Sequence, residues 1–237
     1  AQFYFELIRD EEHIAQTYSV YESKEELFAD IIKKYPVLFY MATYVLIIPV
    51  VLYYQTKFYK NMPIWFTKYI MDIFKRGIFS TVTFMIVMFL GVITTHNKYT
   101  RKLMSIRGEM SIIGCFAALC HNVAFGIRYF VEFFTNASKM NVYTKTATII
   151  SLILIAMMIP LMITSFKCVR KKMKAKNWKN LQKLAYPFFY LIYVHLMVLF
   201  MHKPEKHMLS IVLYTVIYML YTVLRIRKCL ITKKRQR

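Results

Sequence analysis

Acidic residues and glycine are scarce in this chain of 237 residues. It has 12 Asp and Glu against 33 Lys and Arg, which gives a formal net charge of +21, and it has only 5 glycines. Such a basic chain could bind nucleic acid, but its charge lies in short blocks between long apolar runs, and no RNA- or DNA-reading motif with interleaved aromatic residues occurs. Membrane proteins place their basic residues in this way. We therefore expect a lipid bilayer as partner, and no nucleic acid.

Nucleotide-binding motifs are also missing. The sequence has no G-x-G-x-x-G pattern and no P-loop, and nothing in it looks like a second domain. The chain is therefore not expected to bind NAD(P)H on a Rossmann-type fold, so any electrons that it moves must come from elsewhere. Its four cysteines show no C-x-x-C spacing, and disulfides are not expected for residues inside a span or on the cytoplasmic side.

Apolar sequence, in contrast, is abundant. Hydrophobic residues make up 58% of the chain, and six runs are long enough for a transmembrane helix, which needs about 20 residues. Backbone groups in lipid must be hydrogen-bonded within the segment, so these runs predict helices rather than strands. Pro160 and Pro187 should kink the two helices that contain them. The fold class is thus expected to be all-α, an integral membrane bundle of six transmembrane helices at 36–54, 78–95, 110–131, 146–166, 184–202 and 208–224.

The chain divides into three segments: 1–35, the six-helix domain 36–224 and a basic tail, 225–237. Residues 1–35 hold eight of the twelve acids. Within them, Ser23-Lys24-Glu25-Glu26 has the capping-box pattern and precedes apolar residues at helical spacing. We expect a short amphipathic helix on the membrane surface, which could be a solvated lead-in to the first span or a docking surface for a partner.

Basic residues divide unevenly across the predicted membrane. With six spans both termini share one side, and most Lys and Arg fall on that side, especially in 167–183 and 225–237. The positive-inside rule therefore predicts a multi-pass protein of the cell membrane with both termini in the cytoplasm.

Two of the six histidines lie well inside predicted spans. His121 and His195 are each about eleven residues from the cytoplasmic end of their span, which corresponds to about 16 Å at the helical rise. Ionisable residues at this depth are rare and mark functional sites. Two parallel helices with imidazoles at one level could hold a haem iron by two axial histidines, with the porphyrin filling the gap between the helices. Alternatively, each histidine could hydrogen-bond to a neighbouring helix.

Two candidate residues follow these histidines at a spacing of seven, which in an α-helix is nearly the same face, about 10 Å further outward. Arg128 could pair with a haem propionate, or it could pair with Glu132 at i,i+4. His202 could bond to a propionate or line an exit for electrons, or it could be an ordinary interfacial histidine.

Two segments resemble the ferric reductase-like transmembrane family. In RGEMSIIGCFAALCH, residues 107–121, Arg107 stands fourteen residues before His121. In WKNLQKLAY, residues 178–186, the sequence is similar to the family segment W-x-x-L-H-R-L-x-Y, and a further histidine follows thirteen residues after the motif position, here His195. Within the family, the likeness is greatest to the haem-binding membrane subunit of the bacterial periplasmic methionine sulfoxide reductase system.

This resemblance implies a b-type haem in domain 36–224, with His121 and His195 as the metal ligands. It further implies an oxidoreductase component that passes electrons across the membrane. The donor would be a cytoplasmic flavin reductase or a quinol, and the acceptor an extracytoplasmic redox partner or a metal ion.

Gln182 departs from the family pattern. It stands where the family motif has a histidine associated with an additional haem, and glutamine is a poor iron ligand, so a second, inner haem is in doubt. His96 could substitute for that histidine. Alternatively, Arg107, Lys183 and Trp178 could hold an inner FMN, because they supply the basic and aromatic groups that bind a phosphate and stack on a flavin ring.

The sequence therefore predicts a transmembrane b-type haem electron-transfer protein. A transporter or scaffold without a cofactor is the alternative from another class. It would need a polar path between helices, yet few polar residues lie within the spans beyond His121, Asn122, Arg128 and scattered Ser and Thr.

Overall fold

The computed structural model describes residues 63–65, 68–69, 72–93 and 98–236, and every secondary-structure element in these ranges is helical, as predicted. The elements are α4 (Asp72–Lys75), α5 (Ile78–Val92), α6 (Lys98–Ser105), α7 (Arg107–His121), the π-helix η3 (Asn122–Gly126), α8 (Ile127–Asn136), the 3-10 helix η4 (Ala137–Lys139), α9 (Val142–Ser165), α10 (Lys167–Lys172), α11 (Ala175–Gln182), α12 (Ala185–Phe200) and α13 (Pro204–Gln236).

Several of these helices are long and apolar enough to cross a bilayer. They correspond to the last four predicted spans and have the bounds Arg107–Lys139, Val142–Ser165, Ala175–Phe200 and Pro204–Lys234. The predicted span 78–95 corresponds to α5, which has 15 residues and is shorter than a full span. The predicted span 36–54 and the amphipathic helix expected in 1–35 lie outside the described residues. The chain is thus a multi-pass membrane protein, with four spans present in the described part.

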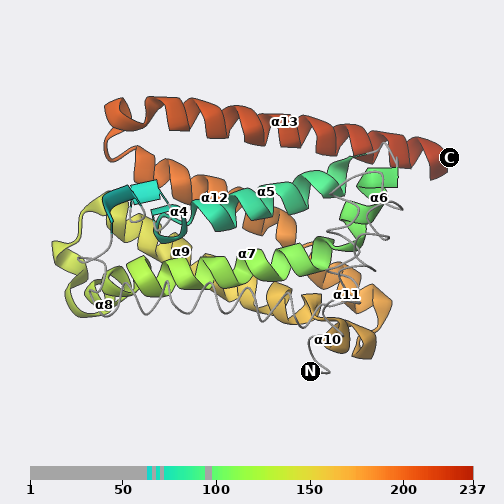
Figure 1. The fold of residues 1–237 in the computed structure, drawn as a ribbon, viewed down its shortest axis with the longest axis horizontal. Helices are drawn as coiled ribbons and strands as arrows, with labels where there is room; N and C mark the ends of the chain where they lie inside the picture. The colour runs from blue at the N-terminus through green and yellow to red at the C-terminus, as the bar shows by residue number, and fades with distance from the viewer. Residues whose placement is uncertain (1–62, 66–67, 70–71, 94–97, 237) are drawn as a thin grey trace, which may run out of the picture.

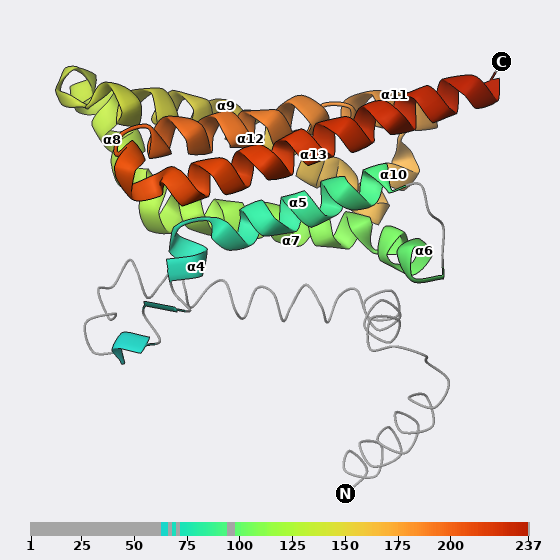
Figure 2. The ribbon, with the colours of Figure 1, turned by 90° about the horizontal axis from the view of Figure 1, so that it is seen from above.

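Five helices form a closed ring in the order α7, α9, α12, α13 and α5, in which each contacts the next and α5 also contacts α12. Figures 1 and 2 show them running alongside one another along the length of the molecule. One end of the ring, which we call the basic end, gathers α6, α10, α11 and the C-terminus of α13 (Figure 1). The opposite end, which we call the α4 end, holds α4, α8 and the turn between α12 and α13.

Apolar side chains fill the interior of the ring and also cover much of its outside. The interior cluster between α5, α7, α9 and α12 comprises Phe84, Cys115, Met158, Leu161, Phe188 and Ile192. A second cluster joins α5 and α12 to α13 and comprises Met85, Met88, Val92, Phe189, Tyr218 and Tyr221. Large apolar side chains also face outward along α13, including Val212, Val216 and Val223. An outward apolar face of this kind is suited to lipid, in which hydrophobic side chains need no burial by protein.

The two prolines have different positions in their helices. Pro160 lies inside α9, as expected. Pro187, in contrast, lies in the first turn of α12, and the helix is interrupted before it, between α11 and α12. Because Pro187 has no N–H, the carbonyl of Lys183 lacks its α-helical donor, and it accepts instead from the N–H of Tyr186 at 3.1 Å. The irregularity expected within 184–202 therefore lies at the start of α12.

Candidate functional site

His121 is the last residue of α7, and its ring is held by the segment that leads into α5. The distance between its Nδ1 and the backbone oxygen of Lys75 is 2.5 Å. A carbonyl can only accept, so Nδ1 carries the proton and Nε2 keeps a free lone pair. Metal-binding histidines in proteins have this arrangement, in which a second group fixes the tautomer and the orientation of the ring.

Gly77 makes room for this imidazole. It is the N-cap of α5 and has a left-handed backbone with φ of 70°. A Cβ at this position would lie 3.2–3.4 Å from three ring atoms of His121. A side chain here would therefore strain the backbone and press on the ring.

His195 lies on α12 and faces α9. Its Nδ1 is 3.5 Å from the hydroxyl oxygen of Ser151, and the backbone carbonyl of Ala147, one turn earlier on α9, also interacts with the ring. The ring is close enough to His121 for the two imidazoles to interact electrostatically. The fold thus brings the two predicted metal ligands together, in the half of the ring toward the α4 end.

These two histidines have the donor set that a bis-histidine haem requires. The Nδ1 of His121 has a protein partner, which leaves its Nε2 available to iron, and Ser151 lies 3.5 Å from the Nδ1 of His195. Among the described residues there is no group of three or more His, Cys, Asp and Glu side chains of the sort that holds a bare metal ion. Haem iron needs only two protein ligands because the porphyrin supplies the other four. The residues present therefore fit a haem better than a free metal ion.

Arg128 does not form an ion pair with Glu132, one of the two partners considered for it from the sequence. Its guanidinium lies over the rings of Phe125 and Tyr129, 4.9 and 4.5 Å from their centroids. The ring of Phe125 stacks in turn on His121 at 6.0 Å. The π-helix η3 lies between His121 and Arg128, and its wider turns alter the register that ideal α-helical spacing assumes. Arg128 is thus separated from the imidazole of His121 by an aromatic ring.

His202 is exposed in the turn between α12 and α13. Its ring lies 5.6 Å from that of Tyr143 at the start of α9. His202 therefore has an exposed position beyond the end of α12, seven residues after His195.

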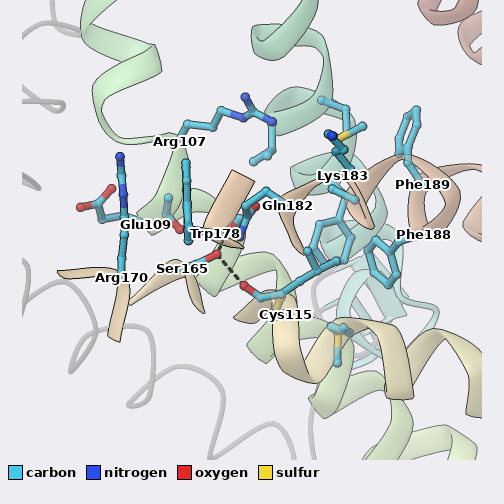
Figure 3. A pocket seen from close by; sticks show the side chains of 18 of the residues that line it. Arg107, Glu109, Cys115, Ser165, Arg170, Trp178, Gln182, Lys183, Phe188 and Phe189 are labelled. Carbon is cyan, nitrogen blue, oxygen red and sulfur yellow. Dashed lines mark hydrogen bonds between the residues drawn. The ribbon is translucent and has the colours of Figure 1, made fainter. Parts of the chain in front are cut away.

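A cavity of about 390 Å³ lies toward the basic end, and Figure 3 shows its lining. Arg107, Trp178, Gln182 and Lys183, the residues singled out in the sequence for an inner cofactor, all line it. Glu109, Arg170 and Trp178 lie at one side of the view, and Phe188 and Phe189 at the other (Figure 3). The cavity thus has a polar, largely basic wall and an apolar wall, and would suit an amphipathic ligand.

Two of these residues are engaged with α9. The indole Nε1 of Trp178 donates to the carbonyl of Thr164 at 3.1 Å, and the side-chain amide of Gln182 donates to the hydroxyl of the same residue at 3.3 Å. One face of the Trp178 ring is covered by the guanidinium of Arg170, 4.2 Å from its centroid. Gln182 therefore links α11 to α9 by a hydrogen bond. A histidine bound to iron at this position could not make the same amide hydrogen bond.

Sequence reasoning missed two groups of residues near this cavity. Glu109 is almost fully buried and pairs with Lys167 at 2.7 Å; an acid at the start of a predicted span was the available signal. Arg225 and Lys228 were assigned to a tail, but both belong to α13 and lie against the bundle. Nothing in the spacing of the tail indicated that contact.

Comparison with known proteins identifies the domain. Residues 76–193 match the family described as "Ferric reductase like transmembrane component". These residues form a ferric reductase-like transmembrane domain. The ferric reductase-like domain includes His121 and the residues of the cavity wall from α7 and α11, and the match ends just before His195.

The chain is also similar to an uncharacterized protein of Treponema pallidum (strain Nichols). The two are 36% identical over 160 residues, which is 66% of this chain and 44% of the relative, so this chain spans less than half the length of the protein that it matches. No solved structure matches the chain.

Proposed function

We propose that this protein is a b-type haem electron-transfer protein of the cell membrane, with His121 and His195 as axial ligands. The ferric reductase-like domain suggests a role in membrane electron transfer, which supports this proposal. A haem with two axial imidazoles supplies one-electron chemistry and leaves no open iron position for a substrate.

The proposal depends chiefly on the arrangement of the two imidazoles. Both are half-buried inside an apolar bundle, and both have Nδ1 directed to a partner in the protein. A histidine that served only to join helices would gain nothing from a second histidine nearby, because two imidazoles repel when protonated and cost desolvation when buried. Their convergence is explained by a shared ligand between them.

We propose both an orientation in the membrane and a direction of electron flow. The basic end would face the cytoplasm with both termini, by the positive-inside rule, and the histidine pair would lie nearer the outer face. Electrons would pass from a cytoplasmic flavin reductase or a quinol to an extracytoplasmic redox partner or a metal ion. The haem-binding membrane subunit of the bacterial periplasmic methionine sulfoxide reductase system is our analogue for this role.

We further propose a single haem. A second one near the basic end would need ligands in the inner cavity, yet none of the described residues that line it is a histidine, and Gln182 is hydrogen-bonded to Thr164. His96, the substitute ligand considered from the sequence, lies outside the described residues. FMN is the candidate that the lining of the cavity favours instead, because Arg107, Lys183 and Trp178 border the same space.

Absorption spectroscopy tests the haem. The protein, purified in detergent from haem-replete cells, should give a reduced-minus-oxidised spectrum of b type, and His121→Ala and His195→Ala should each abolish it. His207→Ala is the matched control, because His207 stacks on Phe200 at 5.1 Å in the first turns of α13, away from the pair. The control should keep the spectrum of the wild type.

Two results of this experiment would contradict the haem proposal. A colourless, folded protein from such cells would favour a transporter or scaffold without a cofactor. A b-type spectrum that survives both alanine variants would mean that other residues hold the haem.

A further inference from the structure

Two basic side chains contact Gly91 at the basic end of the bundle, and a third lies near them. The guanidinium of Arg107 lies so close to Gly91 that a Cβ there would be 3.1–3.2 Å from three of its atoms. The ammonium of Lys228 donates to the carbonyl of Gly91 at 2.8 Å. Arg225, one turn before Lys228, covers the ring of Tyr186 at 4.2 Å and interacts electrostatically with both other cations. We call Arg107, Arg225 and Lys228 the Gly91 cation cluster.

No anion in the described part of the chain balances this cluster. The ion pairs formed there are Arg76–Asp72 and Lys167–Glu109, and neither involves a cluster residue. Three like charges beside a membrane interior repel one another, and surrounding apolar groups strengthen the repulsion by lowering the local dielectric constant. A bound anion would convert this repulsion into attraction.

A buried hydroxyl next to the cluster also lacks a partner. Tyr221 has 0% of its surface exposed, and its hydroxyl forms no hydrogen bond with any residue that the structure describes. The ring packs between Phe89 and Phe189, and Arg107 and Arg225 lie near the hydroxyl. A buried donor without an acceptor is costly, so a ligand oxygen at the cluster would satisfy it.

The surroundings narrow the chemistry of this anion. Two guanidinium groups favour a group with several oxygens in a fixed geometry, and phosphate meets that need. Arg225 and Lys228 also lie on α13 next to outward apolar residues, Val223 and Ile226. Basic pockets between transmembrane helices at the cytoplasmic surface bind phospholipid headgroups.

We propose that the Gly91 cation cluster and the Tyr221 hydroxyl form a binding site for a phosphate group, carried by an anionic phospholipid or by a soluble phosphate ester that enters the adjoining cavity. Arg107 belongs to both the cluster and the cavity lining, so it connects the two. The site does not depend on the haem.

The test is thermal unfolding of the full chain with defined phosphate sources. The lipid arm compares nanodiscs of phosphatidylcholine with nanodiscs that also contain phosphatidylglycerol. The soluble arm compares detergent-purified protein with and without inorganic phosphate or FMN. A rise in melting temperature in the first arm alone identifies a lipid headgroup, and a rise in the second identifies a soluble phosphate.

Two double variants test whether the rise in melting temperature depends on the Gly91 cation cluster. Arg225→Gln/Lys228→Gln should lose the rise in melting temperature. Arg227→Gln/Lys233→Gln removes the same charge from exposed positions of the same helix and should keep it. No rise for the wild type in either arm, or an equal rise for both double variants, would overturn the proposal. The measurement on His121→Ala should give the wild-type rise, which separates this site from the haem proposal.

Discussion

At the scale of single residues, the candidate haem site depends on how each imidazole is oriented. His121 is fixed from two directions, because the Lys75 carbonyl accepts from Nδ1 and Gly77 lies against the ring. His121 and His195 could be predicted as candidates because they lie deep in apolar runs of the sequence. Lys75 and Gly77 could not be predicted, because a backbone carbonyl and a left-handed glycine have no signature in spacing or hydropathy.

Gly77→Ala adds only one methyl group, but it should weaken both the fold and the binding of haem. The left-handed backbone should cost about 1 kcal/mol for a residue with a Cβ, and the new methyl group would press on the imidazole of His121. We expect a lower melting temperature and a lower ratio of haem to protein.

Gly108→Ala is the control for this change. Gly108 is in the first turn of α7, and the nearest atom to an added Cβ is 3.8 Å away. Haem content and melting temperature should stay at wild-type values. Equal behaviour of the two alanine variants would contradict the role given to Gly77.

At the scale of elements, long apolar runs predicted the helices α7, α9, α12 and α13 well, because a run of lipid-compatible residues can satisfy its backbone only as a helix. They did not predict the π-helix η3, which is a local change in hydrogen bonding without a signature in composition. Pro187 did predict an irregularity, and the structure places it at the start of α12. The effect of η3 is large, since it alters the register between His121 and Arg128.

The ion pair between Glu109 on α7 and Lys167 on α10 can be tested by mutation. Glu109 on α7 has 5% of its side chain exposed, and its partner Lys167 on α10 has 58% exposed. Lys167→Met should leave a buried carboxylate without its cation. Breaking a fully buried pair costs about 3–5 kcal/mol; because Lys167 is largely solvated, we expect about 1–2 kcal/mol here, measured as a lower melting temperature in detergent.

The double variant Glu109→Gln/Lys167→Met is the control for this ion pair. It removes the charge together with its partner, so most of the lost stability should return. A single variant that is as stable as the wild type would show that the pair does not join the two helices.

At the scale of the whole molecule, the ring of five helices places two distinct sites along one membrane axis. The histidine pair lies toward the α4 end, and the cavity with its cation cluster lies toward the basic end. Sequence reasoning predicted the multi-pass bundle and the uneven charge, which depend on composition. It missed the contribution of Arg225 and Lys228, because packing of α13 against α5 depends on contacts between distant residues.

The central claim is one haem held by two imidazoles, and electron paramagnetic resonance of the oxidised protein tests it most directly. The account predicts a single low-spin ferric signal of bis-imidazole type, with one haem per chain in the same sample. Two low-spin species at twice that haem content, or a high-spin signal from an iron with an open position, would contradict it.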